Sequence, residues 1–435
     1  MKITFLGAGS SVFVRNVLGD CMLSPALRAA TYALYDIDAE RLNDSYNMLT
    51  AINNNCNQGR AKFVRYAGVE NLPAALKDSS FIINAIQVGG YEPCTVTDFE
   101  IPKKYGLRQT IADTLGVGGI FRALRTIPVM QMFAENIETY CPDAMFLNYT
   151  NPMGILTGYM LRYTRVNLVG LCHSVQVCVP KLFKGLGMEY DDTLQWKIAG
   201  INHMAWLLEI TRGKKDLYPE IKHLSKDRGA PDDDRVRHEI MHKFGYYVTE
   251  SSEHNAEYMP YFIKGKYPEL IDRFNIPLDE YPRRCIKHIE EWAKLRVELT
   301  QNSKLTHKRS KEYASHIIEA IATNQPYKFG GNVINHGSIP NLPSYACVEV
   351  PCIADASGIA PTYVGDLPEQ LAALNRTNIN VQLLTIEAAH TLKKDAIYHA
   401  ALMDPHTSAE LSMDDIINLC DDLIDSHGNW LPTYK

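Results

Sequence analysis

The chain has 435 residues, of which 46% are hydrophobic and 22% are charged, a composition typical of a globular protein long enough for two or three domains. Its 44 basic and 50 acidic residues give a formal net charge of -6, and no long run of Lys or Arg is present, which argues against a nucleic-acid partner. No segment has the uninterrupted apolar length that spans a bilayer, so we expect a cytoplasmic protein without a membrane partner.

The first 190 residues alternate β-branched apolar runs with helical patterns, which predicts βαβ units around a parallel sheet. We predict helices over 119–140 and 154–163. The predicted strands lie within 2–9, 30–38, 61–67, 79–86, 144–152 and 167–171. This order is that of an α/β, Rossmann-like, doubly wound sheet.

From about residue 190 onward, helices mix with short strands, and no repeat or flexible linker is present. We therefore predict one doubly wound domain over residues 1–190 and an α+β domain over residues 191–435 packed on it. The long periodic stretch 369–404 should be mostly helix within the second domain.

The turn after the first predicted strand has the composition of a dinucleotide site. Gly7, Gly9 and Ser10 follow an apolar strand and precede a helix, where backbone N–H groups can approach a pyrophosphate. Asp36 ends the second strand, where a carboxylate binds a ribose and disfavours its phosphate, so NAD is favoured over NADP. The third glycine of the usual fingerprint is replaced by Val12. A strand-to-helix turn without a ligand is the alternative, and it ranks below the cofactor site.

Polar and nucleophilic side chains follow the later strands, and the carboxyl ends of parallel strands meet at one edge of a sheet. Each segment alone has an ordinary structural explanation, since Asn-Pro is a frequent turn and a buried Cys is usually core. Because these segments share one edge of the sheet, we predict that they form the part of the dinucleotide site that binds the nicotinamide. The residues concerned are Asn84, Gln87, Asn148, Asn151, Cys172 and His173.

Cys172 has a candidate metal-binding partner downstream. His203 follows Asn202 at the start of a predicted strand, and a thiolate with an imidazole suits a divalent transition metal with open positions for a substrate. Spacing alone favours a core histidine, because distance along the chain does not show that the two residues meet.

Seven ordered segments together resemble glycoside hydrolase family four, over nearly the whole chain. They are ITFLGAGS, VGGYEPCTVTDFEIPKKYGLRQTIADTLGVGGIFRALRTIP, LNYTNPM, GLCHSVQ, GINHMAW, VTESSEHNAEYMPYF and NLPSYACVEVP. The Cys-His-Ser-Val version of the strand-end motif is associated with the family's melibiase-type α-galactosidases. The resemblance implies a cytoplasmic homodimer or homotetramer that acts on small oligosaccharides such as melibiose or raffinose-type sugars.

The resemblance also implies a mechanism in which redox chemistry serves hydrolysis. Bound NAD takes hydride from C3 of the terminal sugar, which acidifies the hydrogen at C2. A base removes that proton, elimination expels the aglycone, water adds at C1, and the hydride returns. A divalent metal, Mn2+ in the family, is held at the positions of Cys172 and His203 and stabilises charge on the sugar oxygens.

The resemblance assigns further roles residue by residue. Tyr258 matches the catalytic base, and His173 sits where the proton donor follows the metal-bound cysteine. Without the resemblance, Tyr258 reads as an aromatic packing against Pro260 and Asp113 as a helix cap. The positions implied to contact the sugar, directly or through neighbours, are Asn151, Asn202, Asp113 and Arg122.

Substrate choice within the family is narrowed by the residues present. Ser174 correlates with galactosides, and Thr95 stands where phosphoglycoside-specific members have Arg. A free α-galactoside is therefore favoured. α-Galacturonidase activity stays open, because Arg283 or Arg284 could bind a carboxylate, and α-glucosidase activity is a further alternative within the family.

Two hypotheses from other functional classes, a dehydrogenase and a non-catalytic NAD sensor, also stay open. The glycine turn, the Asp after the second strand and the Asn-Pro motif suit a 2-hydroxy-acid dehydrogenase like lactate or malate dehydrogenase, which the family's first domain resembles. A dehydrogenase consumes NAD, whereas the glycosidase needs NAD without net turnover. A non-catalytic NAD sensor would leave Tyr258, Cys172 and His203 without a shared purpose.

Overall fold

The computed structural model describes residues 1–435 and contains one sheet that runs through both halves of the chain. Its strands follow the order β10-β8-β7-β12-β11-β6-β5-β4-β1-β2-β3, with β9 paired to β8 and β13 paired to β12. The strands are β1 (Lys2–Leu6), β2 (Thr31–Asp36), β3 (Lys62–Ala67), β4 (Phe81–Asn84), β5 (Met145–Asn148), β6 (Asn167–Gly170), β7 (Leu194–Ile201), β8 (Met204–Arg212), β9 (Lys215–Asp216), β10 (Tyr247–Val248), β11 (Tyr327–Ile334), β12 (Cys347–Asp355) and β13 (Gly358–Pro361).

The six strands of the first half are parallel and confirm the doubly wound prediction. Strands β1, β4, β5 and β6 are almost continuously buried, because helices cover both faces of the sheet. Helices α1 (Ser11–Leu23) and α2 (Ala39–Asn57) share one hydrophobic cluster with the sheet. On the opposite face lie α3 (Leu72–Leu76), α5 (Gly116–Tyr140) and α6 (Met153–Tyr163).

The register of the parallel strands sets three polar segments side by side. Asn84 at the end of β4 pairs with Asn148 at the end of β5, and Asn148 pairs with Gly170 at the end of β6. The residues that follow these strands therefore leave the sheet at one edge, as predicted from the sequence. This edge faces the segments that the second half of the chain contributes.

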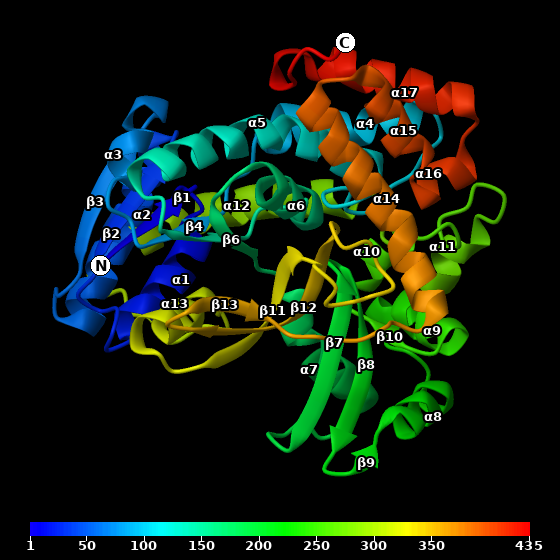
Figure 1. Cartoon of the computed structure of the whole chain (residues 1–435), viewed down its shortest axis with the longest axis horizontal. Helices are drawn as coiled ribbons and strands as arrows, with labels where there is room; N and C mark the ends of the chain where they lie inside the picture. The colour runs from blue at the N-terminus through cyan, green and yellow to red at the C-terminus, as the bar shows by residue number, and fades with distance from the viewer.

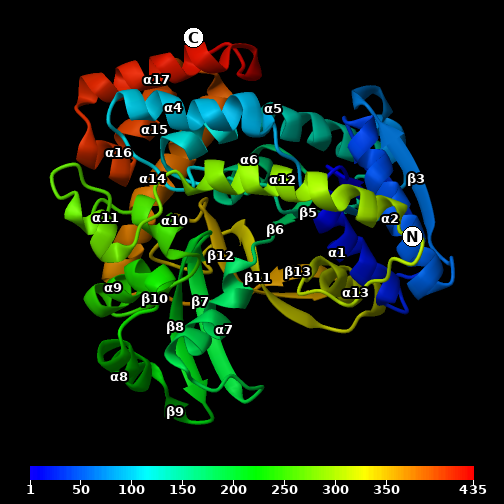
Figure 2. The same cartoon turned by 180° about the vertical axis from the view of Figure 1, so that it is seen from behind.

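The second half extends the sheet with antiparallel strands. β11 joins the parallel part through the pair Asn332 and Gly170, and β12 joins β7 through Glu349 and Gly200. The helices of this region are α7 (Ser174–Leu186), α8 (Tyr218–Arg228), α9 (Arg235–Phe244), α10 (Ser252–Glu257), α11 (Glu269–Phe274), α12 (Glu280–Gln301) and α13 (Ala314–Thr323). In Figure 2, α12 crosses the molecule toward α2, where Arg296 forms ion pairs with Glu40 and Asp44.

The C-terminal helices pack beside α4 and α5, as Figure 1 shows. They are α14 (Glu369–Thr391), α15 (Lys394–Leu402), α16 (Pro405–Glu410) and α17 (Met413–His427); α4 itself is Val96–Lys104 and follows the single π turn Gly90–Thr95. Helices α14 and α15 confirm the mostly helical prediction for 369–404, with a break at Leu392, which has a positive φ of 56°. None of the helices combines the length and apolar composition needed to cross a bilayer.

A buried ion-pair network fastens α17 to α4 and α5. The Arg125 guanidinium donates to Asp98 at 2.6 and 3.0 Å, and His427 Nε2 lies 2.9 Å from Asp98 Oδ1. The side chains of Arg125 and His427 are 0% exposed, and that of Asp98 is 2% exposed. Asp98 is the one acidic side chain that forms an ion pair with the buried Arg125.

We expect Asp98→Ala to lower the free energy of unfolding by about 3–5 kcal/mol, because it leaves a buried arginine uncompensated. Urea unfolding monitored by circular dichroism measures the change. Glu100→Ala on the same helix removes an exposed ion pair with Lys103 and serves as control, with an expected loss below about 1 kcal/mol. Equal unfolding midpoints for the two variants would contradict the network's role.

Candidate functional site

Three residues from separate elements converge next to the carboxyl end of β6. Cys172 follows β6, His203 lies in the two-residue turn between β7 and β8, and Glu250 follows β10. The Cys172 thiol, a ring nitrogen of His203 and a carboxylate oxygen of Glu250 all lie within 4.8 Å of one another. The family resemblance implied a pairing of Cys172 with His203, and the structure brings these two side chains together; the third residue comes from the segment between β10 and α10.

His203 is held so that one ring nitrogen faces this group. Its Nδ1 lies 2.9 Å from the Tyr258 hydroxyl, and its Nε2 lies 3.5 Å from Glu250 Oε2. His203 and Glu250 both have left-handed backbone, with φ values of 64° and 65°. This conformation is uncommon for residues other than glycine, and here it occurs at the turns that bring the two side chains next to Cys172.

Cys172 has the setting of a metal ligand and not of a free nucleophile. Burial raises the pKa of its thiol, and the nearby carboxyl groups of Glu349 and Glu250 add to this rise. The thiol donates one hydrogen bond, to Ser174 Oγ at 3.3 Å. A thiolate at this position needs a cation beside it, and sulfur, imidazole and carboxylate donors together suit a divalent transition metal.

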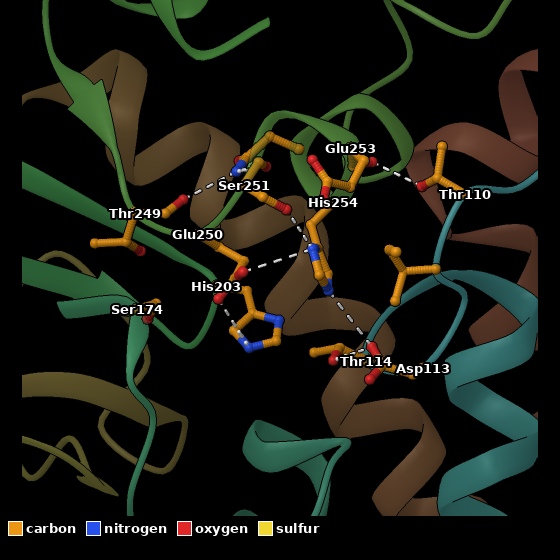
Figure 3. A network of polar contacts seen from close by, with 12 residues as sticks. Thr110, Asp113, Thr114, Ser174, His203, Thr249, Glu250, Ser251, Glu253 and His254 are labelled. Carbon is orange, nitrogen blue, oxygen red and sulfur yellow. Dashed lines mark hydrogen bonds and ion pairs between the residues drawn. The ribbon is translucent and has the colours of Figure 1, made fainter. Parts of the chain in front are cut away.

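A series of carboxyl and imidazole side chains runs from this group toward α5. Figure 3 shows them in order: His203, Glu250, His254 and Asp113. His254 Nδ1 lies 3.6 Å from Glu250 Oε1, and His254 Nε2 lies 3.8 Å from Asp113 Oδ1. Although burial opposes ionisation, the two histidines lower the pKa of the Glu250 carboxyl to about 2.

Tyr258, at the end of α10, is buried beside this series. Its hydroxyl contacts His203, and burial together with the carboxyls of Asp113, Glu257 and Glu250 raises its pKa above the usual value. The hydroxyl is therefore neutral unless a positive charge stands close to it. A cation held by His203 would lie near enough to lower that pKa.

The loop that carries Asp113 is fixed by a buried carboxyl. The Glu257 carboxyl accepts hydrogen bonds from the backbone N–H groups of Thr110 and Ala112 at 2.8 Å each, and a longer one from Ile111. Burial raises the pKa of Glu257 to about 7, with the backbone donors opposing the rise. Because Glu257 precedes Tyr258, α10 positions the tyrosine and the Asp113 loop together.

Arg122 lies on α5 with 7% of its surface exposed. Its Nη1 donates to the Tyr281 hydroxyl at 3.3 Å, and its guanidinium lies 5.6 Å from the centre of the Tyr281 ring. Tyr281 is on α12, so this contact joins α5 to the helix that crosses the molecule in Figure 2.

The glycine turn after β1 has the shape of a nucleotide cradle. Gly7 has a φ of 85°, and a Cβ on it would lie 2.6 Å from the Ala85 carbonyl oxygen. The Gly9 N–H donates to Asp36 Oδ2 at 2.6 Å, and Ser10 occupies the N-cap of α1 without using its side chain there. Asp36 thus lies against the turn. The N–H groups of Ser10 and Ser11 donate to the Gly7 and Gly9 carbonyls, whereas those of Val12 and Phe13 in the first turn of α1 have no backbone acceptor and are available to an anion.

The other predicted contact residues differ in their accessibility. Asn84 is fully buried and donates to Asn148 Oδ1 and Thr150 Oγ1, whereas Gln87 is exposed. The side-chain amide of Asn202 and the Oδ1 atom of Asn151 are buried without a hydrogen-bond partner. Buried polar atoms of this kind need a partner, and a bound ligand would supply it.

His173 is not part of the Cys172, His203 and Glu250 group. Its Nε2 lies 2.7 Å from Glu312 Oε2, and its side chain is 43% exposed. The ring packs among aromatic side chains from other elements: Phe13, Tyr149 and Tyr313. The predicted proton donor therefore lies between the start of α1 and the segment before α13, beside the group formed by Cys172, His203 and Glu250 and not inside it.

Sequence reasoning missed Glu250, His254, Glu257 and Glu312. The first three lie in VTESSEHNAEYMPYF, whose density of acids and histidine was the available signal. Three other residues discussed above are occupied elsewhere. Arg284 contacts Glu253 and Glu280, Arg283 contacts Glu280, and Thr95 Oγ1 donates to the Gly90 carbonyl.

Comparison with known proteins decides the family. Residues 2–188 match the profile described as Family 4 glycosyl hydrolase, and residues 198–407 match the Family 4 glycosyl hydrolase C-terminal domain. The chain belongs to glycosyl hydrolase family 4. Two similar family members are an alpha-galactosidase of Bacillus subtilis (strain 168), 62% identical with both chains fully covered, and an alpha-galactosidase of Rhizobium meliloti (strain 1021), 32% identical over all of this chain and 89% of that one.

Solved structures give the same family fold. A 6-phospho-alpha-glucosidase from gut microorganisms, crystallised with NAD and Mn2+, superposes with a TM-score of 0.80 at 20% identity and covers 100% of this chain and 99% of its own. A lactate dehydrogenase from Eimeria maxima has a TM-score of 0.51 at 14% identity and covers 90% of this chain and 96% of its own. The family 4 fold therefore contains the dehydrogenase-like Rossmann arrangement predicted from the sequence.

Proposed function

We propose that this protein is an α-galactosidase that hydrolyses terminal α-D-galactosides with NAD and Mn2+ as cofactors. The observation that carries the proposal is the 62% identity, over the full length of both chains, to an alpha-galactosidase. The site geometry supports it, because Cys172, His203 and Tyr258 come together from distant segments. The alternative function of a dehydrogenase is supported only by similarity of fold. A non-catalytic NAD sensor would not require Cys172, His203 and Tyr258 to lie together.

When bound, NAD supplies a reversible oxidation at C3 of the sugar, and Mn2+ supplies a positive charge beside the sugar oxygens. Cys172 and His203 would hold the metal, and the cradle of Gly7, Gly9 and Asp36 would hold the nucleotide. Tyr258 would take the proton from C2, which fits its buried hydroxyl 2.9 Å from a ligand of the metal. Deprotonated Tyr258 is then stabilised by the neighbouring charge.

The remaining predicted residues would orient the sugar and transfer a proton. Asn151 and Asn202 have buried amide atoms without partners, which would bind sugar hydroxyls. His173 would protonate the leaving oxygen, with Glu312 holding its ring. Asp113 and Arg122 would complete the wall of the site on the side of α5.

The residues present favour a neutral galactoside over a galacturonide. A galacturonide would place a carboxylate where the galactoside has its hydroxymethyl group, and it would need a cation free to pair with it. Arg283 and Arg284 are already bound to Glu280 and Glu253 on and near α12. Relatives at 26–28% identity include alpha-galacturonidases, so the galacturonide is the alternative to test.

The test is hydrolysis of the p-nitrophenyl α-galactoside, α-glucoside and α-galacturonide in D2O, with and without NAD, Mn2+ and a thiol reductant. We expect cleavage of the galactoside only when all three additions are present, with deuterium at C2 of the released sugar and no accumulation of NADH. Cleavage by enzyme stripped of nucleotide and metal, or preference for the galacturonide, would contradict the proposal.

The nucleotide cradle gives a separate prediction. We expect Gly7→Ala to weaken NAD binding by about tenfold or more, because the new Cβ meets the Ala85 carbonyl at 2.6 Å and the strained backbone must shift. Titration with NAD followed by calorimetry measures the affinity. Gly106→Ala is the matched control, since Gly106 has a similar φ of 79° with nothing within 4 Å of an added Cβ. Equal NAD affinities would show that the turn does not touch the cofactor.

We also propose a division into an NAD-binding domain over residues 1–190 and a domain over residues 191–435 for catalysis, substrate binding and oligomerisation. The shared sheet supports docking of the two and not independent movement. A cytoplasmic homodimer or homotetramer is proposed in addition, and all ten cysteines are unpaired, as a reducing compartment would keep them. Light scattering of the purified protein measures the assembly.

A further inference from the structure

We propose that Glu250 is a third protein ligand of the metal, in addition to Cys172 and His203. This inference rests on the proposed function. The evidence is the position of the Glu250 carboxylate relative to the other two donors. All three donor atoms lie within 4.8 Å of one another. Ligand atoms stand about 2.0–2.6 Å from such ions, so atoms on opposite sides of one ion lie up to about 5 Å apart.

The hydrogen-bonding state of Glu250 favours direct ligation. Neither oxygen of its carboxylate makes a hydrogen bond, and the nearest ring nitrogens are His203 Nε2 at 3.5 Å and His254 Nδ1 at 3.6 Å. His254 Nδ1 is already bonded to Ser251 Oγ at 2.6 Å, and His203 Nε2 is the nitrogen that Tyr258 leaves free. A largely enclosed carboxylate without a committed donor is matched by a metal ion placed between it and His203.

A second carboxyl near Cys172 does not have these properties. Glu349 on β12 is 1% exposed, and its Oε1 accepts a hydrogen bond from Asn332 Nδ2 at 3.0 Å. Burial raises its pKa to about 7, and it is not a member of the three-residue group. One Glu349 oxygen is thus already bonded to Asn332, and the other is buried without a partner, but the carboxyl lies outside the group of donors that could share one ion. Glu250 lies inside that group, and neither of its oxygens accepts a hydrogen bond from the protein.

A carboxylate ligand has consequences for the choice of metal and for its charge. Oxygen donors suit Mn2+ better than a purely soft site does, so Glu250 would moderate the preference of Cys172 for softer ions. A thiolate and a carboxylate together neutralise the charge of a divalent ion. Three protein ligands still leave positions open for two sugar oxygens, as catalytic metal sites require.

The test measures binding of Mn2+ alone to the full-length enzyme loaded with NAD, by electron paramagnetic resonance of free Mn2+ and by water-proton relaxation of bound Mn2+. For Glu250→Gln we expect the affinity for Mn2+ to fall by more than the about 10–100-fold that loss of an orienting residue causes. We also expect about one additional water on the bound ion, in the position that the carboxylate leaves. Glu250→Asp, which keeps a shorter carboxylate, should bind with intermediate affinity and also covers the case in which the glutamine variant does not fold.

Glu253→Gln is the matched control, since it removes the same charge from the same segment while its side chain faces Arg284, and it should bind Mn2+ as wild type does. Unchanged Mn2+ affinity in Glu250→Gln, or weaker binding without an additional water, would overturn the inference and leave Glu250 as a residue that only orients His203. Failure of the proposed function is distinguishable, because wild type itself would then not bind Mn2+ in a manner sensitive to Cys172→Ser.

Discussion

Replacement of Tyr258 by phenylalanine is expected to lower kcat on p-nitrophenyl α-galactoside by about 10²–10⁴-fold, the usual contribution of a positioned acid or base. The change removes the hydroxyl, which lies at a hydrogen-bonding distance of 2.9 Å from His203 Nδ1, and keeps the buried ring. Loss of that hydrogen bond costs about 1 kcal/mol of stability, so the variant should fold. Incorporation of deuterium at C2 in D2O should fall with the rate.

Tyr261→Phe is the control for this substitution. Tyr261 lies three residues further along the same segment and is 50% exposed, so removal of its hydroxyl should leave turnover unchanged. If Tyr258→Phe hydrolysed the galactoside at a rate close to wild type and still exchanged the C2 hydrogen, another group would have to be the base. The nearest candidate would then be His254, which lies between Glu250 and Asp113.

The parallel half of the fold was predictable because its sequence signals are local. Strands β1, β4, β5 and β6 are short, mostly apolar runs that end in a polar residue or glycine or directly before a glycine, and burial on both faces makes such runs conspicuous. The meeting of Asn84, Asn148 and Cys172 at one sheet edge also follows, since it needs only a parallel order. The antiparallel half was not predicted in detail, because its pairings join segments as distant as Gly170 and Asn332.

The site itself was predictable only in part for the same reason. Cys172 and His203 were expected to meet because of a resemblance to a family, and not because spacing along the chain requires it. Glu250 gave no periodic signal: it lies in a turn, in left-handed backbone, and reaches the group only because β10 pairs with β8. His173 shows the converse, since its neighbour Cys172 is in the metal group while its own ring turns to Glu312.

Replacement of Cys172 by serine is expected to lower kcat/KM by about 10³-fold, because a Lewis acid contributes several kcal/mol and each 1.4 kcal/mol is worth a factor of ten. A serine hydroxyl is smaller than the thiol and does not ionise readily, so the charge beside His203 and Tyr258 would be lost with the metal. Mn2+ added in excess should not restore activity. Assays of galactoside hydrolysis across a Mn2+ titration, in the presence of a reductant, measure both effects.

Cys56→Ser is the control, because Cys56 is a half-buried thiol on α2 that contacts His307 and no residue of the metal group. Its activity should match wild type, and it should still be inactivated when the reductant is replaced by a mild oxidant, since Cys172 remains. Wild-type kinetics in Cys172→Ser would refute the ligand role. A thiolate ligand at an open site is itself a target of oxidation, so we expect Cys172 to be the thiol that the reductant protects. If the sensitivity to oxidation instead disappeared in Cys56→Ser, the oxidised thiol would be on α2, and the need for a reductant would be unrelated to the metal site.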